Sequence, residues 1–249
     1  MHLPCEQFEE RIMKTEISVV IPVFNDVESL KIAIPKSLDV LDSYGKSFEL
    51  IIAEDGSTDG SRELVEDWMT KDSRVILLHS DERQGRGRAL NRALKVSRGS
   101  IFCYYDVDLA TDLKHLPELL SCIERGAAVA TGSRLMKDSN IKRSGDREIA
   151  SRGYNFLVRL FLRSHIHDHQ CGFKAYNTEI LRKLSEKIQA SHWFWDTESI
   201  ILAEQEHLRI DEFPVVWIQG EGTTVRMKDV INMGTDILKL WWRLHVEKN

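Results

Sequence analysis

The sequence lacks several features that would assign it to a specialised class of protein. It contains only four cysteines in 249 residues, and none forms a Cys-x-x-Cys pair, so neither a zinc ribbon nor a disulfide framework is indicated. Five prolines and 14 glycines are too few for a collagen-like or low-complexity chain. No uncharged apolar run approaches the roughly 18 residues of a membrane span. The remaining balance, 42% hydrophobic and 29% charged residues, is that of an ordinary globular protein.

The chain also lacks an excess of positive charge. Lys and Arg number 34 against 39 Asp and Glu, a formal net charge of −5, so we expect no nucleic-acid partner and no general attraction to anionic lipid. The first residues lack the basic start and apolar stretch of a secretory signal. Because the cysteines suggest no disulfides, a reducing compartment is favoured, and we expect a cytoplasmic protein.

Apolar runs alternate with amphipathic segments in the first half of the chain, which is the pattern of a parallel sheet with crossover helices. Polar and glycine-rich residues follow the apolar runs, and open α/β sheets bind ligands at this carboxyl edge. The fold class is therefore α/β, and the loops after the strands are the candidate site. The predicted strands are residues 17–21, 48–53, 75–78 and 101–105, and the predicted helices are residues 27–44, interrupted at Pro35, 61–70 and 88–96.

The second half is less regular and contains a basic segment. Residues 134–163 carry eight Lys or Arg against three Asp or Glu, a local net charge of +5, which makes this segment a candidate anion site. Farther on, apolar residues at helical intervals over residues 230–244 predict one amphipathic helix. Because Trp241 and Trp242 lie on it among basic side chains, this helix is a candidate for contact with a membrane surface. Packing against the domain or a partner subunit is the alternative.

Two aspartates follow the fourth predicted strand. Asp106 and Asp108 are two residues apart, and on extended backbone such side chains point the same way, so both carboxylates can converge on one divalent cation. Two carboxylates completed by substrate phosphates make a usual site for Mg or Mn, because the metal neutralises the charge on a departing diphosphate. A solvated turn is the alternative.

Two other predicted strands end in polar turns. Asn25 and Asp26 follow the first, and Asp55 follows the second within a run of Asp, Gly, Ser and Thr. A carboxylate at the position of Asp55 can accept a hydrogen bond from a nucleobase N–H, and Gly56 permits close approach of the backbone. Turn and helix-capping chemistry is the alternative for this run.

A basic glycine-rich turn opens the third predicted helix. Gly85, Arg86 and Gly87 lack the third glycine of a dinucleotide loop and follow no strand directly, so we exclude a Rossmann dehydrogenase. The turn suits a phosphate instead, through backbone N–H groups and the Arg86 guanidinium.

Histidine and tryptophan clusters support less specific predictions. His165, His167 and His169 share one face if the segment is extended, a spacing that can bind zinc, but a solvated strand end is the favoured interpretation. Trp193 and Trp195 are expected in the core rather than as a platform for a sugar.

In their order, the motifs resemble those of the family-2 inverting glycosyltransferases, whose A-type nucleotide-diphospho-sugar fold has a central, mostly parallel sheet flanked by helices. Five segments carry the resemblance: Val-Val-Ile-Pro-Val-Phe-Asn-Asp from residue 19, Glu-Asp-Gly-Ser-Thr-Asp-Gly-Ser from residue 54, Gly-Arg-Gly-Arg-Ala-Leu from residue 85, Asp-Val-Asp-Leu-Ala-Thr from residue 106 and Thr-Gly-Ser-Arg from residue 131.

Later segments narrow the resemblance to the dolichyl-phosphate hexose synthases. These are Ser-Arg-Gly-Tyr-Asn from residue 151, Asp-His-Gln-Cys-Gly-Phe-Lys from residue 168 and Phe-Trp-Asp-Thr-Glu from residue 194. Ala110-Thr111 and the segment from Gln170 to Lys174 look most like the β-glucosyltransferase branch. Two positions depart from the family pattern: Asp26, where Glu is common, and Ala110, which removes a potential metal ligand.

The resemblance implies a single catalytic domain over residues 15–225, with a donor half at about 15–133 and an acceptor half at about 134–225, followed by the amphipathic helix over 226–249. It implies that Asp106 and Asp108 hold Mg or Mn. We expect Asp108, Asp168 and Arg134 to be the catalytic residues. The implied binding residues are, for the nucleotide diphospho-sugar donor, Pro22, Val23, Asn25, Asp26, Asp55, Ser57, Arg86, Gly87, Asp106, Val107 and Asp108, and, for the acceptor phosphate, Arg134, Arg147, Ser151 and Arg226.

The implied reaction is the inverting transfer of a hexose, glucose being favoured, to dolichyl or polyprenyl phosphate. A phosphate monoester carries about −1.5 to −2 charge near pH 7 and is already a nucleophile, so no strong base is needed. Arginine suits bidentate binding of this phosphate, and three of the four acceptor positions are Arg. Asp168 is expected to orient the acceptor or an arginine, with capping of a turn as the alternative, and Asp196 and Glu198 are expected to support the site.

These expectations describe an enzyme peripheral at the cytoplasmic face of a membrane, with a separate membrane-anchoring partner or a homo-oligomer as further options. One alternative is an enzyme of the same fold that uses mannose or a soluble or saccharide acceptor. The other is a non-catalytic module that binds a sugar nucleotide.

Overall fold

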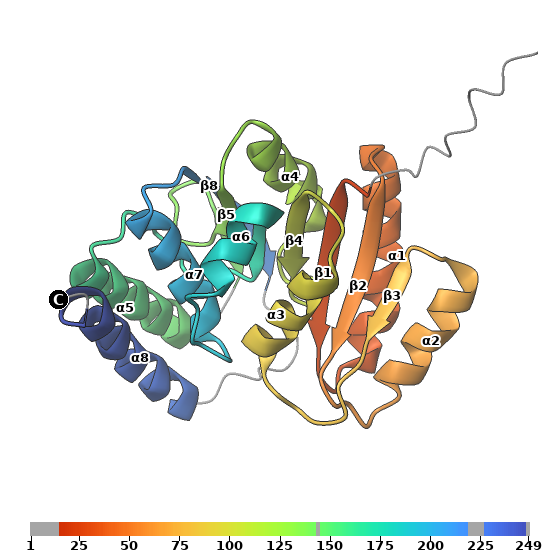
Figure 1. The fold of residues 1–249 in the computed structure, drawn as a ribbon, viewed down its shortest axis with the longest axis horizontal. Coiled ribbons are helices and arrows are strands. Elements are labelled where there is room, and N and C mark those ends of the chain that lie inside the picture. The colour runs from red at the N-terminus through yellow and green to blue at the C-terminus, as the bar shows by residue number, and fades with distance from the viewer. Residues whose placement is uncertain (1–14, 143–144, 219–226, 248–249) are drawn as a thin grey trace, which may run out of the picture.

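A seven-stranded sheet runs through the centre of the computed structural model, which describes residues 15–142, 145–218 and 227–247 (Figure 1). The strand order is β3-β2-β1-β4-β7-β5-β8. β7 is antiparallel to both of its neighbours, and the other neighbouring strands are parallel, so the predicted α/β class with a mostly parallel sheet is confirmed. The strands are β1 (Ile17–Val23), β2 (Phe48–Glu54), β3 (Val75–Leu78), β4 (Ile101–Tyr105), β5 (Val129–Ser133), β7 (Phe173–Asn177) and β8 (Ile210–Pro214).

The predicted elements of the first half are found within two residues of their expected ends. The helices there are α1 (Val27–Tyr44), α2 (Ser61–Lys71) and α3 (Arg86–Val96). One prediction is wrong, because α1 is not interrupted at Pro35. A proline removes one hydrogen bond from a helix interior. The helix continues because it buries an apolar face that includes Leu30 and Leu41.

Helices cover both faces of the sheet, and each face has its own apolar core. Successive side chains of a strand point to opposite faces, so Val19 and Ile21 of β1 join one core while Val20 joins the other. The first core includes side chains of α1, α2 and α4 (Leu116–Glu124), which follows the short helix η1 (Leu113–His115). The second includes side chains of α3, α6 (Thr178–Ser185) and α7 (Phe194–Gln205).

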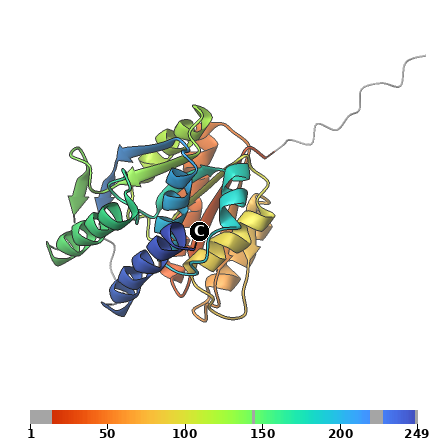
Figure 2. The ribbon, with the colours of Figure 1, turned by 60° about the vertical axis from the view of Figure 1, so that its left-hand side comes forward.

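A third, smaller core joins α7 to two long helices, α5 (Gly145–Leu162) and α8 (Met227–His245), which lie side by side (Figures 1 and 2). Ile237 of α8 packs in this core with Val158 of α5 and Ile201 of α7. The C-terminal amphipathic helix is therefore present: Met233, Ile237 and Leu240 are buried against the domain, whereas Leu238 and Trp242 are exposed. A small sheet of β6 (Asn140–Lys142) and β9 (Val216–Ile218) completes the fold.

Candidate active site

Asp106 and Asp108 lie immediately beyond β4, at the carboxyl edge of the sheet. The backbone N–H of Asp106 donates to the carbonyl oxygen of Gly172 at 3.1 Å, and Oδ1 of Asp108 accepts from the backbone N–H of Ala110 at 3.0 Å. The Asp106 side chain is 42% exposed, and Asp108 is exposed as well. The predicted pair of carboxylates is therefore accessible to a ligand.

Asp108 is exposed, but neighbouring protein atoms remove part of the water around its carboxyl group. This desolvation, followed by the negative charges of Asp106 and Asp26, raises the pKa of Asp108 to about 6. A divalent cation would offset such repulsion between carboxylates. The described ranges contain no cluster of three or more His, Cys, Asp or Glu able to hold a metal, so two aspartates would leave positions for water and phosphate oxygens. The residues present fit Mg or Mn.

Arg86 lies between two carboxylates from different halves of the chain. Its Nε and Nη2 donate to Oδ1 of Asp106 at 3.1 and 2.8 Å, and its Nη1 donates to Asp196 on α7. The guanidinium also lies over the ring of Tyr104, with 5.1 Å from its carbon to the centroid, and at 5.5 Å from that of Trp193. The predicted phosphate-binding arginine is thus beside the aspartate pair, where it is ion-paired and nearly buried.

Asn25 joins the loops that follow β1 and β2. Its backbone N–H donates to Oγ of Ser57 at 3.0 Å, and its Oδ1 accepts from the N–H of Thr58 at 2.8 Å. Asn25 has a φ of 50°, in the left-handed region that asparagine tolerates. Asp26 caps α1, since its Oδ1 accepts from the N–H of Ser29 at 3.2 Å. Three predicted donor residues, Asn25, Asp26 and Ser57, therefore lie together and fix these loops.

Asp55 is buried, and protein groups engage both of its carboxylate oxygens. Oδ2 accepts from the backbone N–H groups of Gly85 at 2.7 Å and Gln84 at 3.1 Å, and Oδ1 accepts from Nη1 of Arg92 at 3.0 Å. Its own N–H donates to the carbonyl of Val23 at the end of β1. In this structure Asp55 holds the glycine-rich turn in place.

The glycines of this turn allow close packing against the start of α7 and the segment before it. A Cβ on Gly87 would lie 2.8 Å from Cβ of Trp195 in α7, and a Cβ on Gly85 would lie 2.3 Å from Nδ1 of His192 before it. Gly85 also has a φ of 106°, which strains any other residue. The turn is thus fixed against α7. The remaining donor positions, Pro22 and Val23 in β1 and Val107 between the aspartates, are buried or partly buried there.

Arg134 and Asp168 form a bidentate ion pair. Nε and Nη2 of Arg134 donate to Oδ2 and Oδ1 of Asp168 at 2.7 and 2.9 Å, and the backbone N–H of Arg134 also donates to Oδ2 at 2.9 Å. Burial by itself would raise the pKa of Asp168, but the Arg134 guanidinium outweighs it and holds that pKa well below its usual range. Asp106 also acts electrostatically on Arg134, so the pair is near the aspartate site. Asp168 orients an arginine, as one of the two expectations had it, and also accepts from the N–H of Gln170 in a turn.

The structure describes the other three predicted acceptor residues in different detail. Ser151 lies on α5 and is partly exposed. Arg147 is one helical turn before it, and its side chain is not described. Arg226 lies outside the described residues. The structure therefore brings together Arg134 and Asp168 but does not test the full set of four.

The histidines do not share one face. His169 is buried, its Nδ1 is 2.8 Å from Oδ1 of Asn155, and its Nε2 is 2.7 Å from Oγ of Ser164. Burial lowers the pKa of His169 to about 3, which fits a neutral ring with both nitrogens engaged. His167 is exposed and contacts Glu212 instead. This geometry contradicts both the zinc alternative and the solvated strand end at His169, because one histidine is a core residue.

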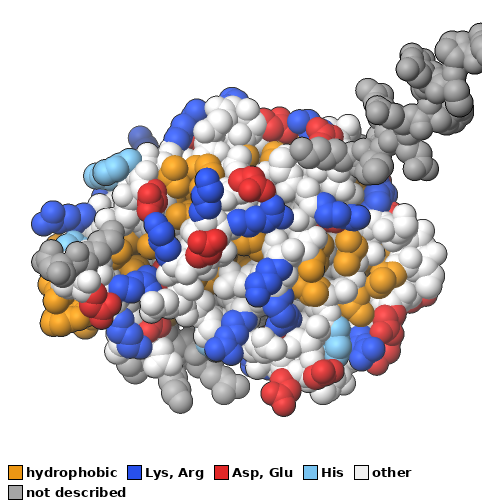
Figure 3. Space-filling view, in the orientation of Figure 1, with side chains coloured by type: hydrophobic (Ala, Val, Ile, Leu, Met, Phe, Trp, Pro, Cys, Tyr) orange, Lys and Arg blue, Asp and Glu red, His pale blue; other side chains and the backbone are white. Residues whose placement is uncertain are grey.

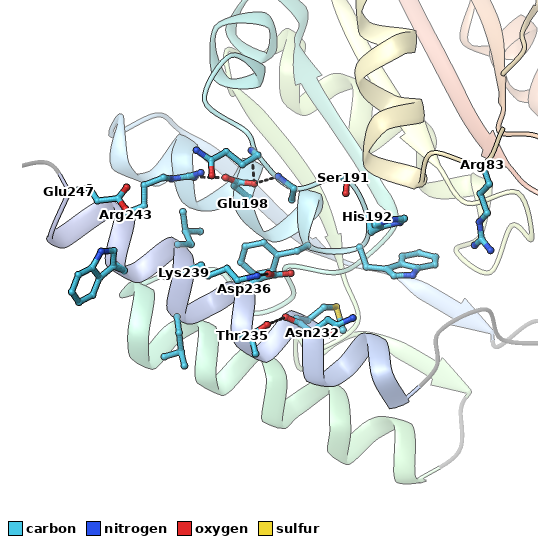
Figure 4. Close-up of a pocket in the computed structure, with 18 of the residues that line it drawn as sticks. Arg83, Ser191, His192, Glu198, Asn232, Thr235, Asp236, Lys239, Arg243 and Glu247 are labelled. Carbon is cyan, nitrogen blue, oxygen red and sulfur yellow. Dashed lines mark hydrogen bonds and ion pairs between the residues drawn. The ribbon is translucent and has the colours of Figure 1, made fainter. Parts of the chain in front are cut away.

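Glu198 ties α7 to α8, a contact that no sequence pattern indicated. One oxygen accepts from the backbone N–H groups of Gln189 and Ala190 at 3.0 and 2.7 Å, and the other accepts from Arg243 (Figure 4). Glu198 is buried, both of its carboxylate oxygens are hydrogen-bonded, and its role as a support for the site stays a prediction. Its partner Arg243 lies 45 residues away in sequence, so only the packing of α8 reveals the pair.

A cavity of about 1370 Å³ lies beside the site, between the loop after β1, the segment before α7, and α8 (Figure 4). Its lining includes Asn25 and Arg83 at the donor end and Lys239 on α8. Trp195 is fully buried, as predicted, but Trp193 is only partly buried and lines this cavity. The prediction that both tryptophans belong to the core is therefore confirmed only for Trp195.

Large apolar side chains are exposed on α5 and α8. Figure 3 shows hydrophobic side chains gathered at the edge of the molecule where these helices lie, with Lys and Arg side chains nearby. None of the helices in the described part of the chain is long and apolar enough to cross a membrane. The exposed apolar residues are Ile149, Phe156, Leu157, Leu160 and Phe161 on α5, and Leu238 and Trp242 on α8.

The fold is that of an A-type nucleotide-sugar glycosyltransferase, and the two aspartates lie at the carboxyl edge of its sheet. The family model named Glycosyl transferase family 2 matches residues 18–185 of the chain. The protein therefore belongs to glycosyl transferase family 2, as its motifs predicted.

Curated relatives cover nearly the whole chain. Glycosyltransferase AglD of Haloferax volcanii is 43% identical over 235 residues, which is 93% of this chain and 38% of that protein. The chain thus spans well under half the length of this relative. Dolichyl-phosphate beta-glucosyltransferases of Dictyostelium discoideum and Saccharomyces cerevisiae are 29% and 28% identical, over 91% and 89% of this chain and 74% and 73% of those proteins.

Solved structures share the fold at low identity. Glucosyl-3-phosphoglycerate synthase from Mycobacterium tuberculosis, in complex with Mn²⁺, UDP and phosphoglyceric acid, has a TM-score of 0.67 at 18% identity and covers 92% of this chain and 78% of its own. The mannosyltransferase PcManGT from Pyrobaculum calidifontis, in complex with GDP-mannose and Mn²⁺, has a TM-score of 0.61 at 18% identity, with 91% and 65% covered. Both neighbours bind Mn²⁺ with a nucleotide or nucleotide sugar.

Proposed function

We propose that this protein transfers a hexose, glucose in preference to mannose, from a nucleotide diphospho-sugar to the phosphate of dolichyl or polyprenyl phosphate, with inversion at the anomeric carbon. One observation carries the proposal: a buried carboxylate, Asp168, fixes an arginine, Arg134, near a pair of carboxylates that fits a divalent cation. The site therefore offers separate means of binding two anionic substrates.

On the donor side, Asp106 and Asp108 would hold Mg or Mn. The cation supplies charge neutralisation for the departing nucleoside diphosphate. The Arg86 guanidinium lies beside these aspartates and suits the same diphosphate. The loop after β1, with Asn25 and Asp26, is proposed to contact the nucleoside.

On the acceptor side, Arg134 is the anchor for a phosphate. Its ion pair with Asp168 uses Nε and Nη2, and within the described residues Nη1 has no hydrogen-bond partner, so that edge can meet a phosphate oxygen. Ser151, Arg147 and Arg226 are proposed to complete the clamp. Because the phosphate monoester is already charged, alignment for in-line attack is the main task, and no general base is required.

The choice of sugar and acceptor rests on the relatives. The two beta-glucosyltransferases that match over about nine-tenths of this chain carry dolichyl phosphate and glucose in their names. Glucose, and with it a UDP-glucose donor, is therefore proposed ahead of mannose.

A lipid acceptor requires contact with a membrane, and the exposed apolar face of α5 supports this. Five large apolar side chains lie on that helix beside the exposed Arg159. Apolar side chains edged by basic ones suit the interface of an anionic bilayer. We propose peripheral attachment at the cytoplasmic face through α5 and α8. A separate anchoring partner or a second copy of the chain would be further means of attachment.

Transfer of radiolabelled hexose tests the proposal. Purified protein is incubated with dolichyl phosphate, Mg or Mn, and either UDP-glucose or GDP-mannose, and label is counted after organic extraction. We expect label in the organic phase from UDP-glucose, with none for Asp108→Ala. Comparison of Mg with Mn identifies the preferred cation.

The other outcomes point to the alternatives. Label from GDP-mannose alone would replace glucose by mannose. Donor binding without any lipid-linked product would contradict the lipid acceptor and favour a soluble or saccharide acceptor. Donor binding with neither transfer nor hydrolysis would favour a non-catalytic module.

A further inference from the structure

A row of four charged side chains leads from the protein interior to Asp106. Lys174 of β7 lies 3.2 Å from Oδ1 of Asp196, Oδ2 of Asp196 accepts from Arg86, and Arg86 donates to Asp106. Asp196 also accepts from the hydroxyl of Tyr104, and Lys174 also donates to a backbone carbonyl. Every member of the row is therefore hydrogen-bonded, and the row couples β7 and α7 of the acceptor half to Asp106 of the donor half.

The row is deeply buried except at its last member. Lys174 and Asp196 are buried, Arg86 is nearly so, and Asp106 is the exposed end. Burying charges destabilises a protein in the absence of compensation, and well-packed apolar residues often give equal or greater stability. Stability alone is therefore a weak explanation for this row. Its exposed end is the part that can act on a ligand.

Asp106 is confined from the opposite side by Gly172. A Cβ on Gly172 would lie 1.9 Å from Oδ2 of Asp106, so only glycine leaves room for the carboxylate in this position. Arg86 binds the other oxygen, Oδ1. The orientation of this carboxylate is thus fixed by two contacts, one from α3 and one from the segment before β7.

We infer that Asp196 is a positioning residue for the divalent cation of this site, although it lies 90 residues from Asp106 in sequence. Asp196 shares the charge of Arg86, so that Arg86 orients Asp106 without neutralising it completely. If Asp196 is neutralised, Arg86 pairs with Asp106 alone and competes more strongly with a cation. The inference rests on the proposed function only in that Asp106 and Asp108 hold the cation.

The test is binding of Mn²⁺ alone, followed by the paramagnetic resonance signal of the free ion, with no sugar nucleotide present. For Asp196→Asn we expect affinity to fall about 10- to 100-fold, the range typical of residues behind a metal ligand. The matched control is Glu49→Gln, a buried acid of β2 whose carboxylate contacts Ser18 and Arg98 instead. Its Mn²⁺ affinity should be unchanged.

A second variant separates positioning from general damage. Lys174→Met removes the other cation beside Asp196, so that Asp196 holds Arg86 more strongly and Asp106 is freer to bind Mn²⁺. We expect its affinity to be equal to or tighter than that of the parent. Circular dichroism and thermal unfolding establish that each variant is folded.

Four outcomes overturn one idea or the other. Unchanged affinity in folded Asp196→Asn contradicts the role of Asp196, and so does an equal fall in Lys174→Met, which would show that any damage to the row weakens the site. If the parent protein binds no Mn²⁺, or if Asp108→Asn binds it as well as the parent, the proposed cation site itself is wrong.

Discussion

The proposed donor and acceptor sides of the site hold their carboxylates in opposite states. On the donor side Asp108 is accessible, has no ion pair within the part of the chain that the structure describes, and has a pKa raised to about 6. On the acceptor side Asp168 is fully buried, paired with Arg134, and has a pKa held well below its usual range. The Asp108 carboxylate is therefore free to bind a cation, whereas the Asp168 carboxylate already pairs with a cationic group of the protein.

This difference fits what each half is proposed to bind. A diphosphate arriving with a cation needs carboxylates that are not yet neutralised. A phosphate arriving without one needs a fixed cationic group, and an arginine is fixed most directly by a carboxylate behind it. Under the proposed function, aspartate therefore serves as a metal ligand in one half and as a support for an arginine in the other. The comparison predicts opposite responses to neutralising the two.

The largest expected effect is on stability, in Asp168→Asn. Removing one partner of a buried ion pair leaves Arg134 uncompensated, and we expect the free energy of unfolding to fall by about 3–5 kcal/mol, measured by urea unfolding. The control is Asp211→Asn, which breaks an Arg209 pair of the same bidentate geometry at the surface, at 2.9 and 2.7 Å. That change should cost at most about 1 kcal/mol. Equal losses of unfolding free energy in both variants would contradict the idea that the buried ion pair matters more to stability than the surface pair.

Asp108→Asn should separate activity from stability. Loss of a direct cation ligand should lower hexose transfer at least about 100-fold, the upper end of the range for residues behind a ligand. The melting temperature without cation should hold or rise, because the raised pKa of Asp108 means that its ionisation opposes folding. A marked fall in melting temperature, as in Asp168→Asn, would show that Asp108 is a structural residue.

The donor half could be predicted closely from sequence because its structure is local. Each strand is an apolar run, each functional loop follows directly after it, and the period of the next segment marks a helix. Asp106, Asp108 and Asn25 were found in this way, and Arg86 was found from the basic glycine-rich turn that opens the next helix. The error at Pro35 arose because a local rule about proline ignores the apolar face that α1 buries on the sheet.

The acceptor half was less predictable because its contacts join distant residues. Arg134 meets Asp168 across 34 residues, Arg86 meets Asp196 across 110, and Arg243 meets Glu198 across 45. Hydrophobic periodicity does not predict pairs so far apart in sequence. The resemblance to a family identified Arg134 and Asp168 as candidate residues but did not predict that they contact each other. His169 was expected at a solvated strand end, but tertiary packing buries it with a neutral ring.

Lowering the pH should reduce the free energy of unfolding of the protein, because His169 is buried as a neutral ring. Its pKa is about 3 in the folded protein and about 6.5 when unfolded, so the unfolded chain takes up a proton first as the pH falls below about 6.5. At pH 5 this should cost about 2 kcal/mol relative to neutral pH. Asp168, with its lowered pKa, adds a loss below about pH 4, where the unfolded carboxyl protonates.

The measurement is the free energy of unfolding at pH 7 and pH 5 for the parent and for His169→Gln. The variant should be less stable at pH 7, because it loses a packed ring, yet its stability should change less between the two pH values. Asp108 acts in the opposite direction, since its raised pKa favours the fold at lower pH, and this contribution cancels in the difference between parent and variant. Identical pH dependence in both proteins would contradict a neutral buried His169.

The smallest expected effect is on membrane binding, and it compares the surfaces of the two halves. Phe156 on α5 and Ile32 on α1 are exposed to similar extents, 63% and 53%, but only Phe156 has exposed apolar neighbours on its own helix. For Phe156→Ser we expect binding to vesicles of mixed neutral and anionic lipid to weaken about tenfold, or about 1.4 kcal/mol of lost apolar burial. Ile32→Ser should bind as the parent does, measured by cosedimentation. Equal weakening in both variants would mean that the protein binds the bilayer without a preferred face. No weakening in either variant would mean that α5 does not bind the bilayer, and its exposed apolar side chains would then no longer support a lipid acceptor.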